Sequence, residues 1–188
     1  MTRLPLTPSQ TVGPFLHIAL SWEDGADAVR ADATGAVWLR GQVYDGAGAP
    51  LPDAMVETWQ ADAEGRFSHP DDPRGAVVAP DGFRGFGRCT TGPDGDWAIR
   101  TVKPGALPTA DGRSQAPHID VSVFARGLLD RVVTRLYFSD ETDANDTDPV
   151  LGSIAEHRRG TLVAQRTADG YQFDIRLQGD GETVFFDL

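Results

Sequence analysis

The residues best suited to chemistry lie together in one stretch of the chain, APHIDVSVFARG at residues 116–127. Successive side chains of an extended strand point to opposite faces, so His118 and Asp120 are predicted to share one face with Ser122. An imidazole and a carboxylate on one face can hold a metal ion, and they can equally form a hydrogen-bonded pair in a polar pocket. At the far end of this stretch, Arg126 offers a guanidinium that binds carboxylates as a fork.

The elements that must position these residues are short strands separated by turns. Runs typical of strands, with Gly, Pro and Asp between them, occur at residues 37–45, 54–60, 87–91, 96–102, 131–138, 161–166, 170–177 and 183–186. Helical periodicity is nearly absent: residues 154–159 are predicted to form one helical turn, and the acidic run at 140–148 a loop. We therefore expect an all-β protein, an antiparallel β-sandwich with long loops. Residues 1–22 are predicted to form an extended N-terminal arm, and residues 23–188 a single domain.

Composition narrows the classes of function. The chain has 188 residues and a formal net charge of -11, which would repel the phosphates of nucleic acids. No apolar run is long enough to cross a bilayer, and the N-terminus lacks the apolar core of a signal peptide, so we expect a cytoplasmic protein that binds no membrane. With Cys89 alone, an internal disulfide is impossible, and a buried, inert thiol is expected. An anionic small molecule would need a local cation to bind.

Several kinds of catalytic site find little support in the sequence. No serine lies in a Gly-x-Ser-x-Gly turn, and no glycine-rich loop ends in Lys-Ser or Lys-Thr. A non-haem iron site could combine His118 and Asp120 with His157 as a facial triad. His157 lies in the polar run EHRR, where a solvated histidine is the commoner case. An independent iron oxygenase is therefore one alternative, and a hydrogen-bonded polar pair is another.

Seven segments, in register from the arm to the C-terminus, carry a family resemblance. They are TPSQTVGPF at residues 7–15, GQVYD at 41–45, ETWQAD at 57–62, TVKPG at 101–105, APHI at 116–119, TRLYF at 134–138 and GETVFFD at 181–187. As a set they resemble the intradiol ring-cleaving dioxygenases, and within that family the alpha chains of the two-chain enzymes that act on protocatechuate. Part of this pattern also occurs in transthyretin-like sandwiches, so a non-catalytic binding module is a further alternative.

The resemblance implies how iron is held. In the family a related beta chain binds ferric iron through two tyrosines and two histidines. In this chain Trp97 and Leu107 stand where we place the two tyrosines, and Asp120 replaces one histidine while His118 keeps the other. The resemblance thus implies that this chain has no metal ligands and no catalytic residues, and that Fe(III) is bound by the partner beta chain. His118, Asp120, Trp97 and Leu107 are then expected to pack as a vestigial site.

The resemblance also implies a role for this chain in substrate binding. The family's active site lies between the alpha and beta chains, and Thr11, Gly13 and Pro14 of the arm together with Arg126 are the matching pocket residues. The implied reaction inserts both atoms of O2 into protocatechuate and gives 3-carboxy-cis,cis-muconate. Arg126 would face the substrate carboxylate, since a charge-assisted hydrogen bond lowers the cost of burying that group.

Overall fold

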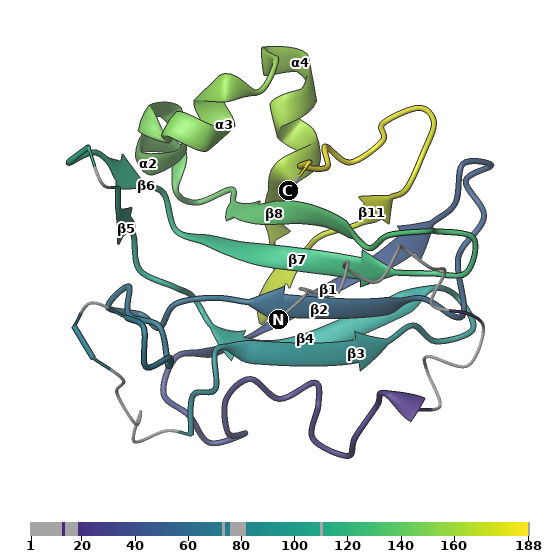
Figure 1. Ribbon diagram of the computed structural model, residues 1–188, viewed down its shortest axis with the longest axis horizontal. Coiled ribbons are helices and arrows are strands. Elements are labelled where there is room, and N and C mark those ends of the chain that lie inside the picture. Colours follow the sequence, from purple (N-terminus) through teal and green to yellow (C-terminus); the bar gives the residue numbers. More distant parts are fainter. Residues whose placement is uncertain (1–12, 14–18, 73, 76–81, 110, 188) are drawn as a thin grey trace, which may run out of the picture.

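The computed structural model describes residue 13 and residues 19–72, 74–75, 82–109 and 111–187. Strands form most of the regular structure in these ranges (Figure 1). The strands are β1 (Ala36–Tyr44), β2 (Met55–Trp59), β3 (Phe86–Thr90), β4 (Asp96–Val102), β5 (Leu107–Pro108), β6 (Ser114–Gln115), β7 (His118–Phe124), β8 (Val132–Phe138), β9 (Val163–Arg166), β10 (Gly170–Gln172) and β11 (Ile175–Arg176). The helices are α2 (Thr142–Thr147), α3 (Pro149–Ser153), α4 (Glu156–Arg159) and the 3-10 helix η1 (Gly160–Leu162).

Nine of the described strands form one sheet. β7 lies between β2 and β8; β2 pairs on its other side with β3, and β8 leads through β9 and β10 to β1. β4 pairs with the free edge of β1 and also packs against β3. Because β3 and β4 stand at opposite ends of the strand order, the sheet bends round until it is nearly closed.

The predicted all-β class is confirmed, but the predicted antiparallel sandwich is not. β1 runs parallel to β10 and β11, and β8 runs parallel to β9, so the sheet is mixed. Parallel neighbours need a crossover connection, and the connection from β8 to β9 contains α2, α3 and α4. The predicted loop at 140–148 is therefore wrong over residues 142–147, which are helical, whereas α4 confirms the helical turn predicted at 154–159.

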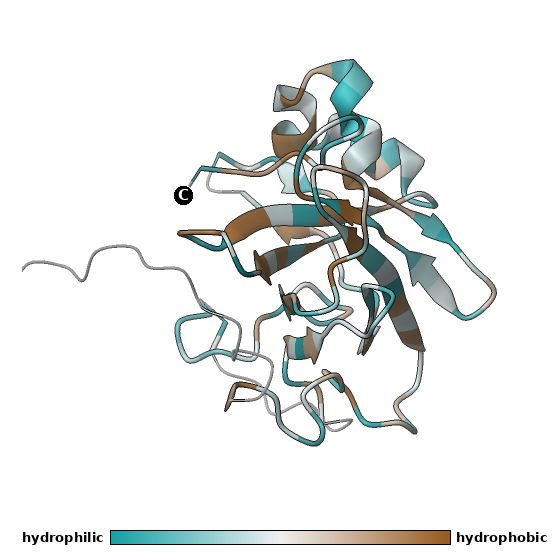
Figure 2. Cartoon of the chain, turned by 90° about the vertical axis from the view of Figure 1, so that its right-hand side faces the viewer, coloured by the Kyte–Doolittle hydropathy of each residue, from teal (hydrophilic) through white to brown (hydrophobic). Residues whose placement is uncertain are grey.

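The main core lies inside the bent sheet. In β7, Ile119, Val121 and Val123 are fully buried, while Asp120 and Ser122 on the other face are partly exposed. The alternation predicted for this strand is thus confirmed. Figure 2 shows hydrophobic residues, coloured brown, concentrated in the strands around this interior. No helix within the described ranges combines the length and the apolar character that a membrane crossing requires.

A second, smaller core lies between β8 and the helices. It is built from Ala116, Tyr137, Leu151 and Leu162. Figure 1 shows the helices gathered on one side of the molecule, next to β8. The start of β7 and the end of β8 are therefore covered, whereas the end of β7 that leads to Arg126 is not under these helices.

Candidate functional site

His118 begins β7 and is 5% exposed. Its Nδ1 lies 2.7 Å from the carbonyl oxygen of Ala116, and because a carbonyl can only accept, Nδ1 is the donor. Its ring packs beside that of Tyr137, with the centroids 5.7 Å apart. Burial, followed by the positive charge of Arg135, lowers the pKa of His118 below its ordinary value of 6.5. His118 is therefore held as a neutral imidazole with its proton on Nδ1.

Asp120 pairs with an arginine rather than with His118. Arg135 stands directly opposite Asp120 in the β7–β8 register, and its Nε lies 3.0 Å from Asp120 Oδ1. The Nη1 of Arg135 donates a second hydrogen bond, of 2.7 Å, to Gln115 Oε1. The alternative of a hydrogen-bonded His118–Asp120 pair is thus wrong: the imidazole N–H donates to a backbone carbonyl, and the carboxylate accepts from a guanidinium.

Asp148 ties this region to the helices. It is 2% exposed, and its carboxylate accepts from the backbone N–H of Ala116 at 2.8 Å and from the Tyr137 hydroxyl at 3.1 Å. The same carboxylate caps α3 by accepting from the N–H groups of Val150 and Leu151. A buried carboxylate is stabilised by such a set of donors. Asp148 therefore holds the start of β7, the end of β8 and α3 together.

These side chains do not fit a metal ion. Among the described residues, no three His, Cys, Asp or Glu side chains are grouped so that they could hold one. His118 uses Nδ1 for a backbone carbonyl, and Asp120 already faces the guanidinium of Arg135, whose charge would repel a cation. His157, the third member of the predicted facial triad, is exposed on α4. The triad reading therefore lacks its third ligand.

Trp97 and Leu107 were expected to fill the metal volume beside His118. Trp97 is 2% exposed and does pack as core, but it lies inside the bent sheet with Ile119, whose side chain leaves β7 on the face opposite to His118. Its Nε1 is buried without a hydrogen-bond partner in the described part of the chain. Leu107 lies in β5, partly exposed, near Gly65. The expectation that Trp97 fills space beside His118 is therefore wrong.

Aromatic side chains that sequence reasoning missed lie beside Asp120 instead. Trp59 of β2 is the strand partner of Asp120, and it stacks on Phe67 with ring centroids 5.8 Å apart. His69 meets the edge of Trp59 at 6.3 Å. The sequence pattern assigned the residues after β2 only to one of the long loops. The sequence did offer a signal: Phe67 and His69 follow Trp59 closely in the chain, which indicates that the loop can fold back so that these rings contact Trp59.

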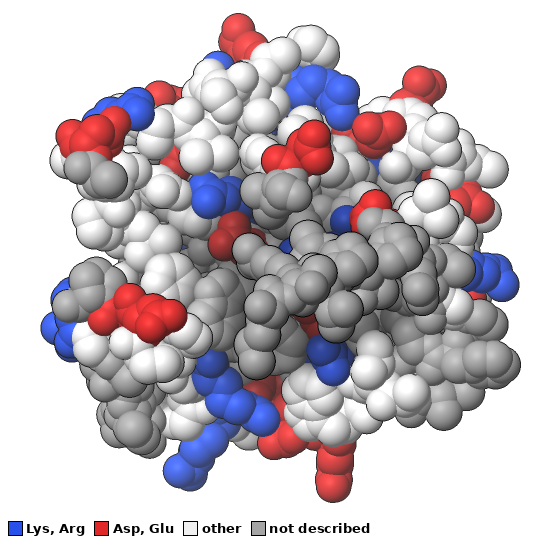
Figure 3. Space-filling view, viewed as in Figure 1, with Lys and Arg blue, Asp and Glu red and all other residues white. Residues whose placement is uncertain are grey.

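The outer face of β7 and β8 also carries a cavity of about 500 Å³. Its polar lining mixes both charges, and its apolar lining comes from three side chains. The lining residues are Asp120, Ser122, Arg131, Val133, Arg135, Val150, Phe186 and Asp187. Figure 3 shows that acidic and basic side chains are interspersed over the side of the molecule seen in Figure 1. The cavity thus has no excess of one charge that would select an anion or a cation.

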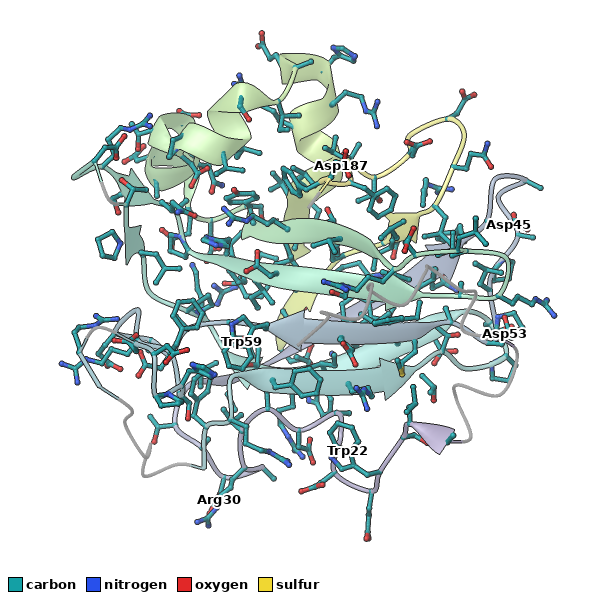
Figure 4. All side chains as sticks on the ribbon, in the orientation of Figure 1. Trp22, Arg30, Asp45, Asp53, Trp59 and Asp187 are labelled. Carbon is teal, nitrogen blue, oxygen red and sulfur yellow. The ribbon has the colours of Figure 1, made fainter. Side chains whose placement is uncertain are left out.

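Arg126 lies at the other end of β7, two residues beyond the strand. The chain turns at Gly127, whose φ of 86° favours glycine. The side chain of Arg126 is 62% exposed, and its Nε lies 3.2 Å from Oδ2 of Asp53, which is only 14% exposed. Figure 4 labels Asp53 and Trp59 at opposite ends of β2, so Arg126 and the His118 region are separated by the length of the strands. Seven residues of strand span about 20 Å, so the two groups cannot serve one small ligand.

The predicted arm residues are described only in part. Gly13 has a φ of 73°, and no atom of the other described residues lies within 4 Å of the position that a Cβ would take. Thr11 and Pro14 lie outside the described residues. The grouping of the arm with Arg126 in a substrate pocket therefore stays a prediction.

Comparison with known proteins places this geometry in a family. The family model described as "Dioxygenase" matches residues 15–179. A protocatechuate 3,4-dioxygenase alpha chain from Pseudomonas putida is 46% identical, over 98% of this chain and 98% of the relative. The chain belongs to the intradiol dioxygenase family. The family resemblance predicted from the seven segments is thus confirmed.

This chain is also similar to a beta chain and to a solved dioxygenase domain. A protocatechuate 3,4-dioxygenase beta chain from Burkholderia cepacia is 35% identical, over 77% of this chain and 65% of the relative. Among solved structures, the dioxygenase domain of a dioxygenase carbohydrate-binding protein fusion from Streptomyces sp. SirexAA-E has a TM-score of 0.56 and 26% identity, covering 92% of this chain and 98% of that chain. The chain is thus related to both chains of the two-chain enzyme, and it matches the alpha chain over its full length.

Proposed function

We propose that this chain is the alpha subunit of a protocatechuate 3,4-dioxygenase and works as a hetero-oligomer with an iron-bearing beta chain. The observation that carries the proposal is the 46% identity to an alpha chain over nearly the whole of both sequences. The reaction adds O2 to protocatechuate and opens the ring between the two hydroxyl-bearing carbons, giving 3-carboxy-cis,cis-muconate. Both oxygen atoms enter the product, so no external reductant is consumed.

The ferric ion of this enzyme is assigned to the beta chain. The support lies in the region of His118, where Arg135 provides a positive charge and Asp120 is its counter-ion. The one histidine kept from the family pattern binds a backbone carbonyl through Nδ1 and is buried against Tyr137. A metal cation beside His118 would be repelled by the guanidinium of Arg135, and the Asp120 carboxylate already neutralises that guanidinium.

The contribution of this chain is to the wall of the substrate pocket. We assign it Arg126, together with Thr11, Gly13 and Pro14 of the arm, and no catalytic residue. Because the chain is acidic overall, a substrate that carries a carboxylate needs a local cation. The exposed guanidinium of Arg126 can reach a ligand held by a neighbouring chain, since only its Nε is engaged within the described part of this one.

The proposal is tested by producing this chain with and without the beta chain encoded by the same organism. We expect the two chains to co-purify, and protocatechuate to be converted to 3-carboxy-cis,cis-muconate with one O2 consumed per ring opened. Each chain alone serves as the control for assembly and for turnover. Ring cleavage by this chain in the absence of any partner would refute the assignment, as would failure of the two chains to associate.

A further inference from the structure

Arg126 forms an ion pair with Asp53. Its Nε lies 3.2 Å from Oδ2 of Asp53, and its terminal amino groups have no other partner in the described part of the chain. The Asp53 side chain is 14% exposed, and its second oxygen, Oδ1, is buried without a hydrogen-bond partner there. An acidic group buried to this extent needs a positive charge nearby. Arg126 is the cation that the described structure supplies.

The sheet register fixes this contact. β2 and β7 are antiparallel, with Met55 opposite Phe124 and Val56 opposite Val123. Continued by two residues beyond the last pair, the same register sets Asp53 opposite Arg126. Directly opposed residues of opposite charge attract each other across a strand pair. The Asp53–Arg126 contact thus follows from the two strands that precede it, and does not depend on the conformation of a long loop.

A guanidinium whose Nε faces its ion-pair partner keeps its two terminal nitrogens available for a carboxylate. A free arginine side chain would have to lose its rotamer freedom when a ligand binds, whereas one that is already held loses less. We infer that Asp53 is a positioning residue, which orients Arg126 towards the carboxylate of the substrate in the pocket shared with the beta chain. This inference rests on the proposed function, because it takes the substrate to be protocatechuate.

The test compares four forms of the assembled alpha–beta enzyme: wild type, Arg126→Ala, Asp53→Ala and the double variant. KM and kcat are measured for protocatechuate and for catechol, which lacks the carboxylate. Removing Asp53 also raises the local positive charge, which would attract the substrate. The assays are therefore run at about 0.5 M salt, because salt at this concentration screens the long-range attraction between exposed charges such as Arg126 and the substrate.

We expect Arg126→Ala to raise KM for protocatechuate about tenfold and Asp53→Ala about threefold, with kcat and the KM for catechol unchanged. The double variant should equal Arg126→Ala, because a positioning residue has no effect once its target is gone. Asp32→Ala is the matched control, since it breaks an ion pair whose partners are 63% and 70% exposed. Figure 4 shows its partner Arg30 far from Asp53. Asp53→Asn, which keeps the size of the side chain, replaces Asp53→Ala if the alanine variant melts at a lower temperature.

Two results would overturn the inference while leaving the proposed function intact: equal effects of Asp53→Ala on both substrates, or effects of Asp53→Ala and Arg126→Ala that add in the double variant. An unchanged KM ratio in Arg126→Ala would overturn it as well, because Arg126 would then not face the carboxylate. A wild-type complex that assembles but cleaves no protocatechuate would refute the proposed function itself.

Discussion

The two ends of β7 both carry charged side chains, but they differ in where those charges find their partners. At the His118 end, the imidazole, Asp120 and Arg135 have their hydrogen-bond partners within the fold. The Asp148 carboxylate accepts four hydrogen bonds there, from the residues before β7, from β8 and from α3. At the Arg126 end, a mostly exposed guanidinium has one ion pair within the described residues, with an acid whose second oxygen is buried and unpaired there. Polar groups satisfied inside a fold stabilise it, whereas an exposed group with unused donors is suited to a ligand or a partner.

This difference separates the effects expected from substitution at the two ends. Changes at the His118 end should alter stability and leave substrate preference unchanged. Changes at the Arg126 end should alter substrate preference.

Asp148→Ala should lower the free energy of unfolding by roughly 3 kcal/mol or more, because it leaves several buried donors without an acceptor at a cost of about 1–3 kcal/mol each. Urea denaturation followed by tryptophan fluorescence measures the change. Asp146→Ala is the matched control, since Asp146 is exposed in α2, and its effect should stay within about 0.5 kcal/mol. Similar midpoints for the two variants would show that Asp148 does not hold the His118 end together.

Stability should fall as the pH drops below about 6.5, and His118 should be one cause. The pKa of His118 is lowered in the folded chain, so the unfolded chain takes up a proton at a higher pH than the folded chain does. The stabilisation is complete above the unfolded pKa of about 6.5 and is lost as the pH falls towards the folded value, by up to about 1.4 kcal/mol per pH unit.

His118→Gln should remove this part of the pH dependence, while His157→Gln, which changes an exposed histidine, should keep it. Urea midpoints measured from pH 7.5 to pH 5 compare the slopes. Neither variant should alter the ratio of the KM values for protocatechuate and catechol. A changed ratio in His118→Gln alone would mean that the two ends of β7 are not separate in function.

Arg126→Ala should raise KM for protocatechuate about tenfold and leave KM for catechol unchanged, equivalent to about 1.4 kcal/mol of binding. Steady-state oxygen uptake by the alpha–beta enzyme gives both constants. The control is Arg126→Lys, which keeps the charge but loses the fork and should fall between the wild type and Arg126→Ala. Equal losses for both substrates would assign Arg126 to assembly instead of carboxylate binding.

Asp32→Ala should have the smallest effect, below about 0.5 kcal/mol in stability, and none on either KM. Its ion pair with Arg30 is exposed on both sides, and such pairs contribute little. Thermal unfolding and the same oxygen-uptake assay measure both quantities. A larger effect would show that exposed ion pairs contribute more to the stability of this chain than solvent screening predicts. A change in KM caused by Asp53→Ala could then not be assigned to the orientation of Arg126.

Local patterns in the sequence were enough to predict much of the sheet. The alternation of HIDVSVF set the two faces of β7 correctly, because a strand with one buried face repeats every two residues. The resemblance based on seven segments identified the family. The class of the fold and the strand that carries the candidate residues could therefore be predicted without coordinates.

Contacts between segments distant in sequence could not be predicted. Trp97 was expected beside His118, but the nearly closed sheet brings it to the inner face of β7, and sequence spacing does not reveal which face a distant strand will meet. The parallel pairing of β8 with β9 depends on a crossover of helices, and α2 was mistaken for a loop because its sequence TDANDT is short and has Ala144 as its one apolar residue. The role of Asp148 as an acceptor for three elements likewise appears only when those elements have packed.

We propose that the beta chain binds the iron and that this chain provides no ligand to it. The iron content of the purified alpha–beta enzyme tests this proposal. Iron is measured per alpha–beta pair in the wild type and in a His118→Ala, Asp120→Ala double variant of this chain. We expect one iron per pair in both. Two irons per pair in the wild type, or a loss of iron in the double variant, would contradict it.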